Sequence, residues 1–156
     1  MSEGLADALR SHVGLPIERS LATASLMLRF DFREREKGRA YLWIDPPWRL
    51  TLGGRFVTGR ADWPRWDGVA EPGVNRPLWE AWCGLLDPIN ATTLAEAFVG
   101  EPMPDLRLRF ASGHEVEVFG DSGRDYWWYY MDRVSGEVFE ATPAGVTRTS
   151  GKPAED

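Results

Sequence analysis

The sequence has 156 residues, of which 43% are hydrophobic and 12% aromatic, enough for one domain with a substantial core. Its 18 basic and 24 acidic residues give a formal net charge of -6, which disfavours non-specific binding to nucleic acids or anionic membranes and favours a basic partner protein. Cys83 is the single cysteine, which excludes an intrachain disulfide.

A short helix is expected near the start of the sequence, over residues 3–12. Ser2 is placed to cap it, and Leu5, Leu9 and Val13 recur at helical spacing and would dock it. The same segment has no apolar run of the length that a secretory signal or a membrane span needs. We therefore expect a cytoplasmic protein.

Two segments, residues 14–50 and 87–146, share one pattern. LMLRF at 26–30 and LRLRF at 106–110 each follow a lead-in that begins after a proline. Each also precedes a second alternating run, RAYLWID in the first segment and HEVEVF in the second. Alternation of apolar and polar residues is typical of half-buried strands, so each unit is expected to contain a β-hairpin.

The second unit has two further elements. Its lead-in, TTLAEAF, is compatible with a capped helical turn, but we favour a strand because Thr93, Ala95 and Ala97 alternate. Downstream, YWWYYM and EVFEAT are typical of a third hairpin, with Asp132 and Gly136 at the ends of its turn.

Residues 51–86 form a crossover of different character, rich in Trp, Gly, Pro, Asp and Arg. Within it, NRPLWEAWCGLLDP predicts a helix, which Asn75 is placed to cap and in which Pro77 suits the first turn. Four apolar residues recur at helical spacing and would form its docking face: Leu78, Trp82, Leu85 and Leu86.

The hairpins favour a mainly β fold, either an antiparallel β-sandwich or a partly open barrel, with one or two short helices. We expect a single globular domain over residues 1–146 and a flexible tail over residues 147–156. The pattern leaves open whether the two units form one sheet or two.

The run DYWWYY, residues 125–130, contains five consecutive aromatic residues, too many for one side of a strand. Either both faces of this strand are buried, or one face binds a ligand or partner. We favour a central strand with one face in the core and the other beneath the crossover.

The repeated order of a lead-in strand, an L-x-L-R-F strand, a glycine turn and an alternating strand resembles a family of uncharacterised bacterial proteins. The family is known chiefly from actinobacterial genomes as a domain of unknown function. The resemblance is strongest over residues 87–146, where LRLRFASGHEVEV, the aromatic strand and GEVFEATPAGV follow in order. It implies no activity and no catalytic residues.

Motifs that suggest catalysis have simpler interpretations. Residues 120–123 spell GDSG, as around the nucleophile of chymotrypsin-like proteases, but the chain is too short for that two-barrel fold and the residues suit a tight turn. His114 and Glu115 are adjacent on a predicted strand and point to opposite faces. We interpret His114 as a solvated turn residue and His12 as a helix cap. No metal-ligand spacing or phosphate loop is present, so we expect no cofactor and no metal.

The segment RADWPRWDG interleaves Arg, Trp and Asp in a proline-containing loop, and Trp and Arg are enriched at interface hot spots. The alternative is that its tryptophans fold back as a lid over the sheet. With the aromatic strand, it supplies the candidate binding residues: Trp63, Arg65, Trp66, Asp67, Trp127 and Tyr129.

We therefore predict a non-enzymatic binding protein that engages a protein partner, of which immunity or antitoxin-type proteins are one instance. The alternative is an aromatic-lined pocket that binds a small molecule or performs acid-base chemistry through Asp45, Asp62, Asp67 or Glu117. A structural subunit of a larger assembly is a third possibility. The oligomeric state stays open.

Overall fold

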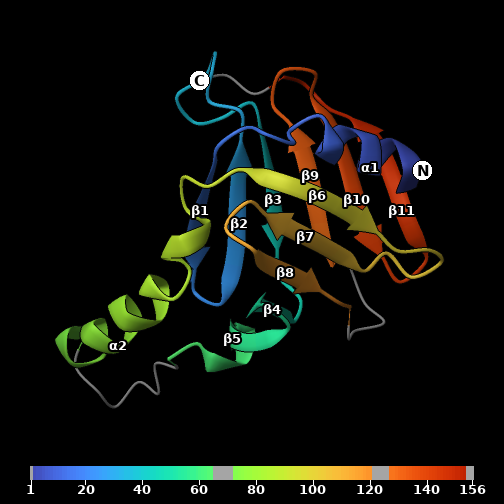
Figure 1. Ribbon diagram of the computed structural model, residues 1–156. Coiled ribbons are helices and arrows are strands. Elements are labelled where there is room, and N and C mark those ends of the chain that lie inside the picture. Colours follow the sequence, from blue (N-terminus) through green and yellow to red (C-terminus); the bar gives the residue numbers. More distant parts are fainter. Residues whose placement is uncertain (1, 65–71, 121–126, 154–156) are drawn as a thin grey trace.

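The computed structural model describes residues 2–64, 72–120 and 127–153 and is mainly β (Figure 1). Two antiparallel sheets pack face to face. Helix α1 (Ser2–Arg10) lies at one end of the sandwich, and α2 (Pro72–Gly84) extends away from the opposite end. The predicted antiparallel β-sandwich is confirmed, with two sheets, and over the described residues these do not close into a barrel.

The six-stranded sheet has the order β1-β2-β3-β9-β10-β11, with the bounds β1 Ile17–Ala22, β2 Ser25–Phe30, β3 Ala40–Ile44, β9 Trp128–Asp132, β10 Glu137–Thr142 and β11 Gly145–Ser150. The five-stranded sheet has the order β5-β4-β8-β7-β6, with the bounds β4 Trp48–Leu52, β5 Arg55–Gly59, β6 Leu94–Val99, β7 Leu106–Phe110 and β8 His114–Val118. Two short 3-10 helices, η1 (Arg60–Asp62) and η2 (Asp87–Ile89), lie in the connections.

Each half of the chain contributes to both sheets. The first half forms the meander β1-β2-β3 in the six-stranded sheet and then crosses over, so that β4 pairs with β8. The second half forms the meander β6-β7-β8 in the five-stranded sheet and crosses back, so that β9 pairs with β3. The predicted hairpins are therefore present, and the two meanders lie in opposite sheets.

The core lies between the sheets and follows the predicted alternation. The alternate residues of LMLRF and LRLRF point inwards and are buried: Leu26, Leu28, Phe30, Leu106, Leu108 and Phe110. Burial of each such side chain contributes about 1.5–3 kcal/mol relative to its exposure. Leu5 and Leu9 of α1 are also fully buried, as predicted, whereas Val13 is exposed.

Helix α2 differs from the prediction. It starts at Pro72, so Pro77 lies inside the helix and not in its first turn. Of the predicted docking residues, Trp82 and Leu86 are buried, but Leu78 and Leu85 are exposed. The reason is geometric: only the carboxyl end of α2 meets the sandwich, and the rest of the helix extends from it (Figure 1).

Strand β6 confirms the preferred interpretation of TTLAEAF. Its register with β7 shifts between Leu94 and Glu96, so that Leu94 and Ala97 are both buried despite their odd spacing. At the other end of the second unit, β11 continues to Ser150 and pairs with β10 along its length. The first residues of the predicted tail, 147–150, therefore belong to a strand, as their β-branched threonines favour.

Strand β9 lies between β3 and β10 and is thus central, as predicted. Trp128 and Tyr130 point into the core and are at most 2% exposed, whereas Tyr129 and Met131 point outwards and are half-buried. The described parts of the crossover lie elsewhere: β5 pairs with β4 in the opposite sheet, and Trp82 of α2 packs beside Trp48. The predicted cover of β9 by the crossover is therefore wrong for these parts.

Neither described helix has the length and apolar content required to cross a membrane.

Candidate functional site

The candidate loop is described only in part. Trp63 follows η1, is half-buried and packs against the hydrophobic core, as the lid interpretation requires for this residue. Arg65, Trp66 and Asp67 lie outside the described residues. Their role in binding stays a prediction.

Trp127 is 4% exposed and does not line a surface, contrary to its selection as a binding residue. A Cβ atom on Gly120 would lie 2.1 Å from the indole ring of Trp127, so the ring occupies the space that the glycine leaves. Strand β9 begins at Trp128, so Trp127 precedes the strand and does not follow its alternation of inward and outward side chains. Two successive tryptophans are therefore both buried.

Tyr129 lies in a cluster on the outside of the six-stranded sheet. Trp43 of β3 pairs with Met27 on one side and with Tyr129 on the other, and Tyr41 pairs with Met131, which in turn pairs with Val138. All six side chains are half-buried and point away from the core. We call this set the aromatic face: Met27, Tyr41, Trp43, Tyr129, Met131 and Val138.

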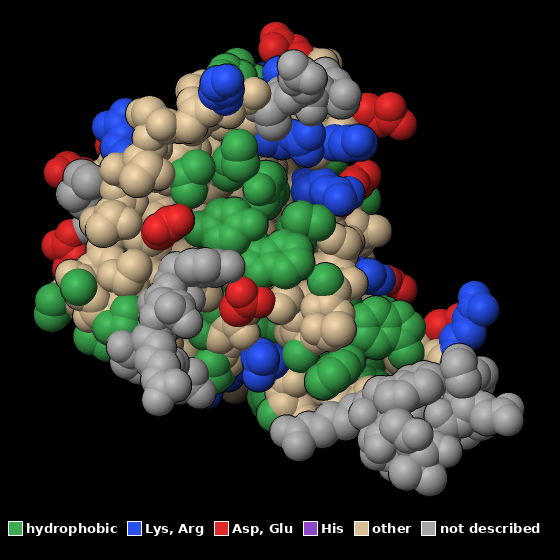
Figure 2. Space-filling view, turned by 180° about the vertical axis from the view of Figure 1, so that it is seen from behind, with side chains coloured by type: hydrophobic (Ala, Val, Ile, Leu, Met, Phe, Trp, Pro, Cys, Tyr) green, Lys and Arg blue, Asp and Glu red, His purple; other side chains and the backbone are tan. Residues whose placement is uncertain are grey.

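Figure 2 shows this side of the molecule, where hydrophobic side chains gather at the centre with charged side chains around them. The rings of Tyr41 and Tyr129 meet edge to face, with centroids 5.8 Å apart. The Tyr41 hydroxyl donates to the sulfur of Met131 at 3.3 Å. Glu140 lies in register beside Tyr129, and Arg29 lies beside Tyr41. All four strands that carry the cluster, β2, β3, β9 and β10, are interior strands of the sheet, which makes it a rigid surface.

His12 is buried and does not cap α1 from the surface, contrary to the prediction. It is 2% exposed, its Nε2 lies 2.8 Å from the Tyr130 hydroxyl, and its ring stacks on Phe30 at 5.0 Å. Burial lowers the pKa of His12 to about 4; nearby Asp31 opposes this shift, and Arg39 adds to it. A histidine enclosed in this way is neutral above that pH and has no access to a substrate.

His114 is also turned inwards, so the interpretation of a solvated turn residue is wrong. It is 8% exposed, and its Nδ1 lies 3.0 Å from the Ser112 hydroxyl. Glu115 points to the opposite face, as predicted, and accepts from Arg109. Of the GDSG motif, only Gly120 lies in the described part of the chain.

The carboxylates considered for acid-base chemistry each have a partner or fall outside the described residues. Asp45 accepts from Ser25, Asp62 accepts from the Thr58 hydroxyl at 3.1 Å, and Glu117 pairs with Arg49. Asp67 is outside the described residues. Within the described part of the chain, no group of three His, Cys, Asp or Glu residues could hold a metal ion.

The sequence pattern anticipated Tyr129 but not its neighbours on β2, β3 and β10. The alternation in RAYLWID did place Tyr41 and Trp43 on one face of a strand. It could not show that this strand would lie beside β9, because the pairing joins residues almost ninety positions apart (Trp43 with Tyr129).

Comparisons of the chain with models of protein families, with curated proteins and with solved structures find no match. The resemblance to a bacterial domain family therefore stays a prediction from the sequence pattern.

Proposed function

We propose that the protein is a non-enzymatic binding protein that engages a basic protein partner through the aromatic face. The observation that carries this proposal is the cluster of Trp43, Tyr41 and Tyr129 with two methionines on the outside of the sheet. Trp, Tyr and Met are enriched where proteins bind one another, because they bury a large area and retain a polar handle.

The charge of the chain favours a basic partner. A net charge of -6 attracts a positively charged surface and accelerates its association. Glu140 beside Tyr129 adds a carboxylate at the edge of the aromatic face, although Arg29 lies at another edge. The apolar centre would supply most of the binding energy, and the acidic surface would select and orient the partner.

A binding role agrees with the state of the reactive side chains. His12 and His114 are buried, and Asp45, Asp62 and Glu117 are engaged by neighbouring groups. The loop from Trp63 to Asp67 is proposed as a second contact, and an immunity or antitoxin-type protein is one instance of such a function.

The test uses two substitutions on the aromatic face, Trp43→Thr and Tyr129→Thr. Threonine favours strands and removes the ring. Phe56→Thr is the matched control, because Phe56 is an exposed aromatic residue on β5 of the other sheet. Each variant is first checked for an unchanged melting temperature. Proteins captured from a lysate of the source organism by the wild type are identified and purified. They are then titrated by calorimetry against the wild type, these three variants and the loop variant Trp66→Ala.

Capture alone does not support the proposal. A basic partner whose affinity falls about thirtyfold with Trp43→Thr or Tyr129→Thr, the effect of a hot-spot residue, and is unchanged with Phe56→Thr would support it. Association of that partner should also slow as salt is raised. A partner whose affinity is insensitive to both face variants would refute the aromatic face as the site. Loss of binding with Trp66→Ala alone would assign it to the loop.

A further inference from the structure

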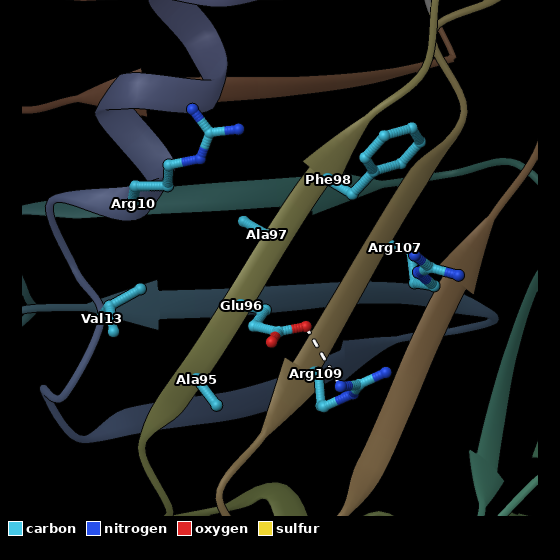
Figure 3. A pocket seen from close by; sticks show the side chains of 8 residues that line it. All are labelled: Arg10, Val13, Ala95, Glu96, Ala97, Phe98, Arg107 and Arg109. Carbon is cyan, nitrogen blue, oxygen red and sulfur yellow. Dashed lines mark ion pairs between the residues drawn. The ribbon is translucent and has the colours of Figure 1, made fainter.

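A groove lies on the outside of the five-stranded sheet, on the opposite side of the sandwich from the aromatic face (Figure 3). The end of α1, strand β6 and strand β7 line it, and its volume is about 460 Å³. The lining also includes Ala95 and Ala97 of β6, which lie beside Arg10 and Val13. The volume is in the range of sites for small organic molecules, about 300–1,000 Å³.

The lining of the groove has an excess of positive charge although the chain as a whole is acidic. Three arginines line it, Arg10, Arg107 and Arg109, against one acidic residue, Glu96. Figure 3 shows Arg10 on one side of β6 and the other two arginines on the other side, on β7. An anion in the groove would therefore meet cationic groups from two elements.

The three arginines differ in how far they are already neutralised. Arg109 is held between Glu96, at 3.1 Å, and Glu115, at 2.8 Å. Arg10 pairs with Asp7 at 3.4 Å, and both side chains are exposed, so this ion pair is weak. Arg107 has no ion pair with any residue in the described part of the chain. Arg107 and Arg10 are therefore the groups available to an anionic ligand.

Phe98 adds an aromatic surface between these arginines. Its side chain is 55% exposed, and the guanidinium of Arg107 lies over its ring, 5.5 Å from the centroid. This contact fixes the plane of the guanidinium and leaves much of the Phe98 ring open to solvent. A second groove of about 220 Å³ shares Phe98 and Arg107 and continues towards Phe119.

We propose that this groove binds a small organic anion in which an aromatic ring carries a carboxylate or phosphate group. The guanidinium of Arg107 presents the planar donor pair that such an oxyanion accepts, and Arg10 adds a second positive charge. The ring of the ligand packs against Phe98. A long polyanion fits less well, because Glu96, Glu115 and Glu117 lie along the same outer face of the sheet and would repel it.

The test is an NMR titration of the ¹⁵N-labelled protein with phenyl phosphate and with benzoate. We expect saturable shifts of the amides of β6, β7 and the end of α1. Inorganic phosphate, which has the charge but no ring, and benzyl alcohol, which has the ring but no charge, should each bind more weakly. The substitutions are Arg107→Gln and Phe98→Leu, both at exposed side chains whose loss should leave the fold intact.

Arg107→Gln should weaken binding of both probes about tenfold, the effect of one hydrogen bond to a charged group. Phe98→Leu should weaken it about fivefold, because the aromatic contact is lost. Arg55→Gln is the charge-matched control: Arg55 is exposed on β5 of the same sheet but outside the groove, and its loss should have no effect.

Three results would overturn the proposal: no saturable shift with either probe, equal weakening by Arg107→Gln and Arg55→Gln, or equal affinity for phenyl phosphate and inorganic phosphate. The last result would leave only a general attraction of anions. Because Trp43 and Tyr129 lie on the opposite sheet, their variants should keep full probe affinity, so this site and the proposed protein interface are tested separately.

Discussion

Acidification from pH 6.5 to pH 4 should destabilise the folded protein through the buried pair of His12 and Tyr130. In the unfolded chain His12 has its ordinary pKa of 6.5, whereas burial lowers the pKa to about 4 in the folded protein. Between these values the unfolded chain binds a proton that the folded protein does not bind. Stability is therefore complete above pH 6.5, falls as the pH is lowered, and stops falling from this cause below about pH 4.

The magnitude follows from the width of that window. Where unfolding binds one proton, the free energy of unfolding decreases by about 1.4 kcal/mol for each unit by which the pH is lowered. Across the window the decrease should be about 3 kcal/mol. The carboxyl of Asp31 acts in a separate range, because its hydrogen bond with Arg33 lowers its pKa from 3.8 to about 2. The stabilisation of the folded protein by the Asp31 carboxylate is complete above pH 3.8 and is lost only as the pH falls towards 2.

The assay is urea unfolding, followed by tryptophan fluorescence at several pH values from above 6.5 down to 4. The variant is His12→Phe/Tyr130→Phe, which keeps a ring against Phe30 and removes the titrating group and its hydroxyl partner together. Its stability should be nearly independent of pH in this window. If wild type and the double variant lose the same free energy of unfolding between pH 6.5 and 4, His12 is not the source and the reasoning is refuted.

Three further substitutions or truncations test the packing. Gly120→Ala should lower the free energy of unfolding by about 1–3 kcal/mol, because the new methyl group would collide with Trp127, whereas Gly84→Ala, with no close neighbour, should be nearly neutral in the same urea assay. Thr58→Val should lower the free energy of unfolding by about 1–3 kcal/mol, because the buried indole N–H of Trp82 loses the hydroxyl that accepts from it at 3.0 Å. Thr149→Val changes an exposed position and is the control. An equal effect of the two substitutions would contradict this explanation. Truncation after Gly151 keeps the hydrogen bond from the Gly151 amide to the Gly136 carbonyl and should leave the melting temperature unchanged. Truncation after Val146 removes four residues of β11 and should lower the melting temperature, as differential scanning calorimetry can measure.

Local pattern was sufficient to predict the strands and their inward faces. In LMLRF and LRLRF the apolar residues recur at every second position, and a strand with that period has one apolar face whatever it pairs with. The same holds for the turn between Asp132 and Gly136, where the Asp132 carboxylate accepts from the amides of Val134 and Ser135. These features depend only on residues a few positions apart.

The candidate sites depend on residues that are distant in the sequence, and only the tertiary structure decided them. Trp43 and Tyr129 became neighbours because the second half of the chain crosses back to the first sheet, and His12 meets Tyr130 across 118 positions. Trp127 was a candidate binding residue but is buried, because Gly120 leaves space for its ring. Periodicity tells which face of a strand is apolar, but the order of strands in the two sheets determines which outer side chains come together and which remain open to a ligand or partner.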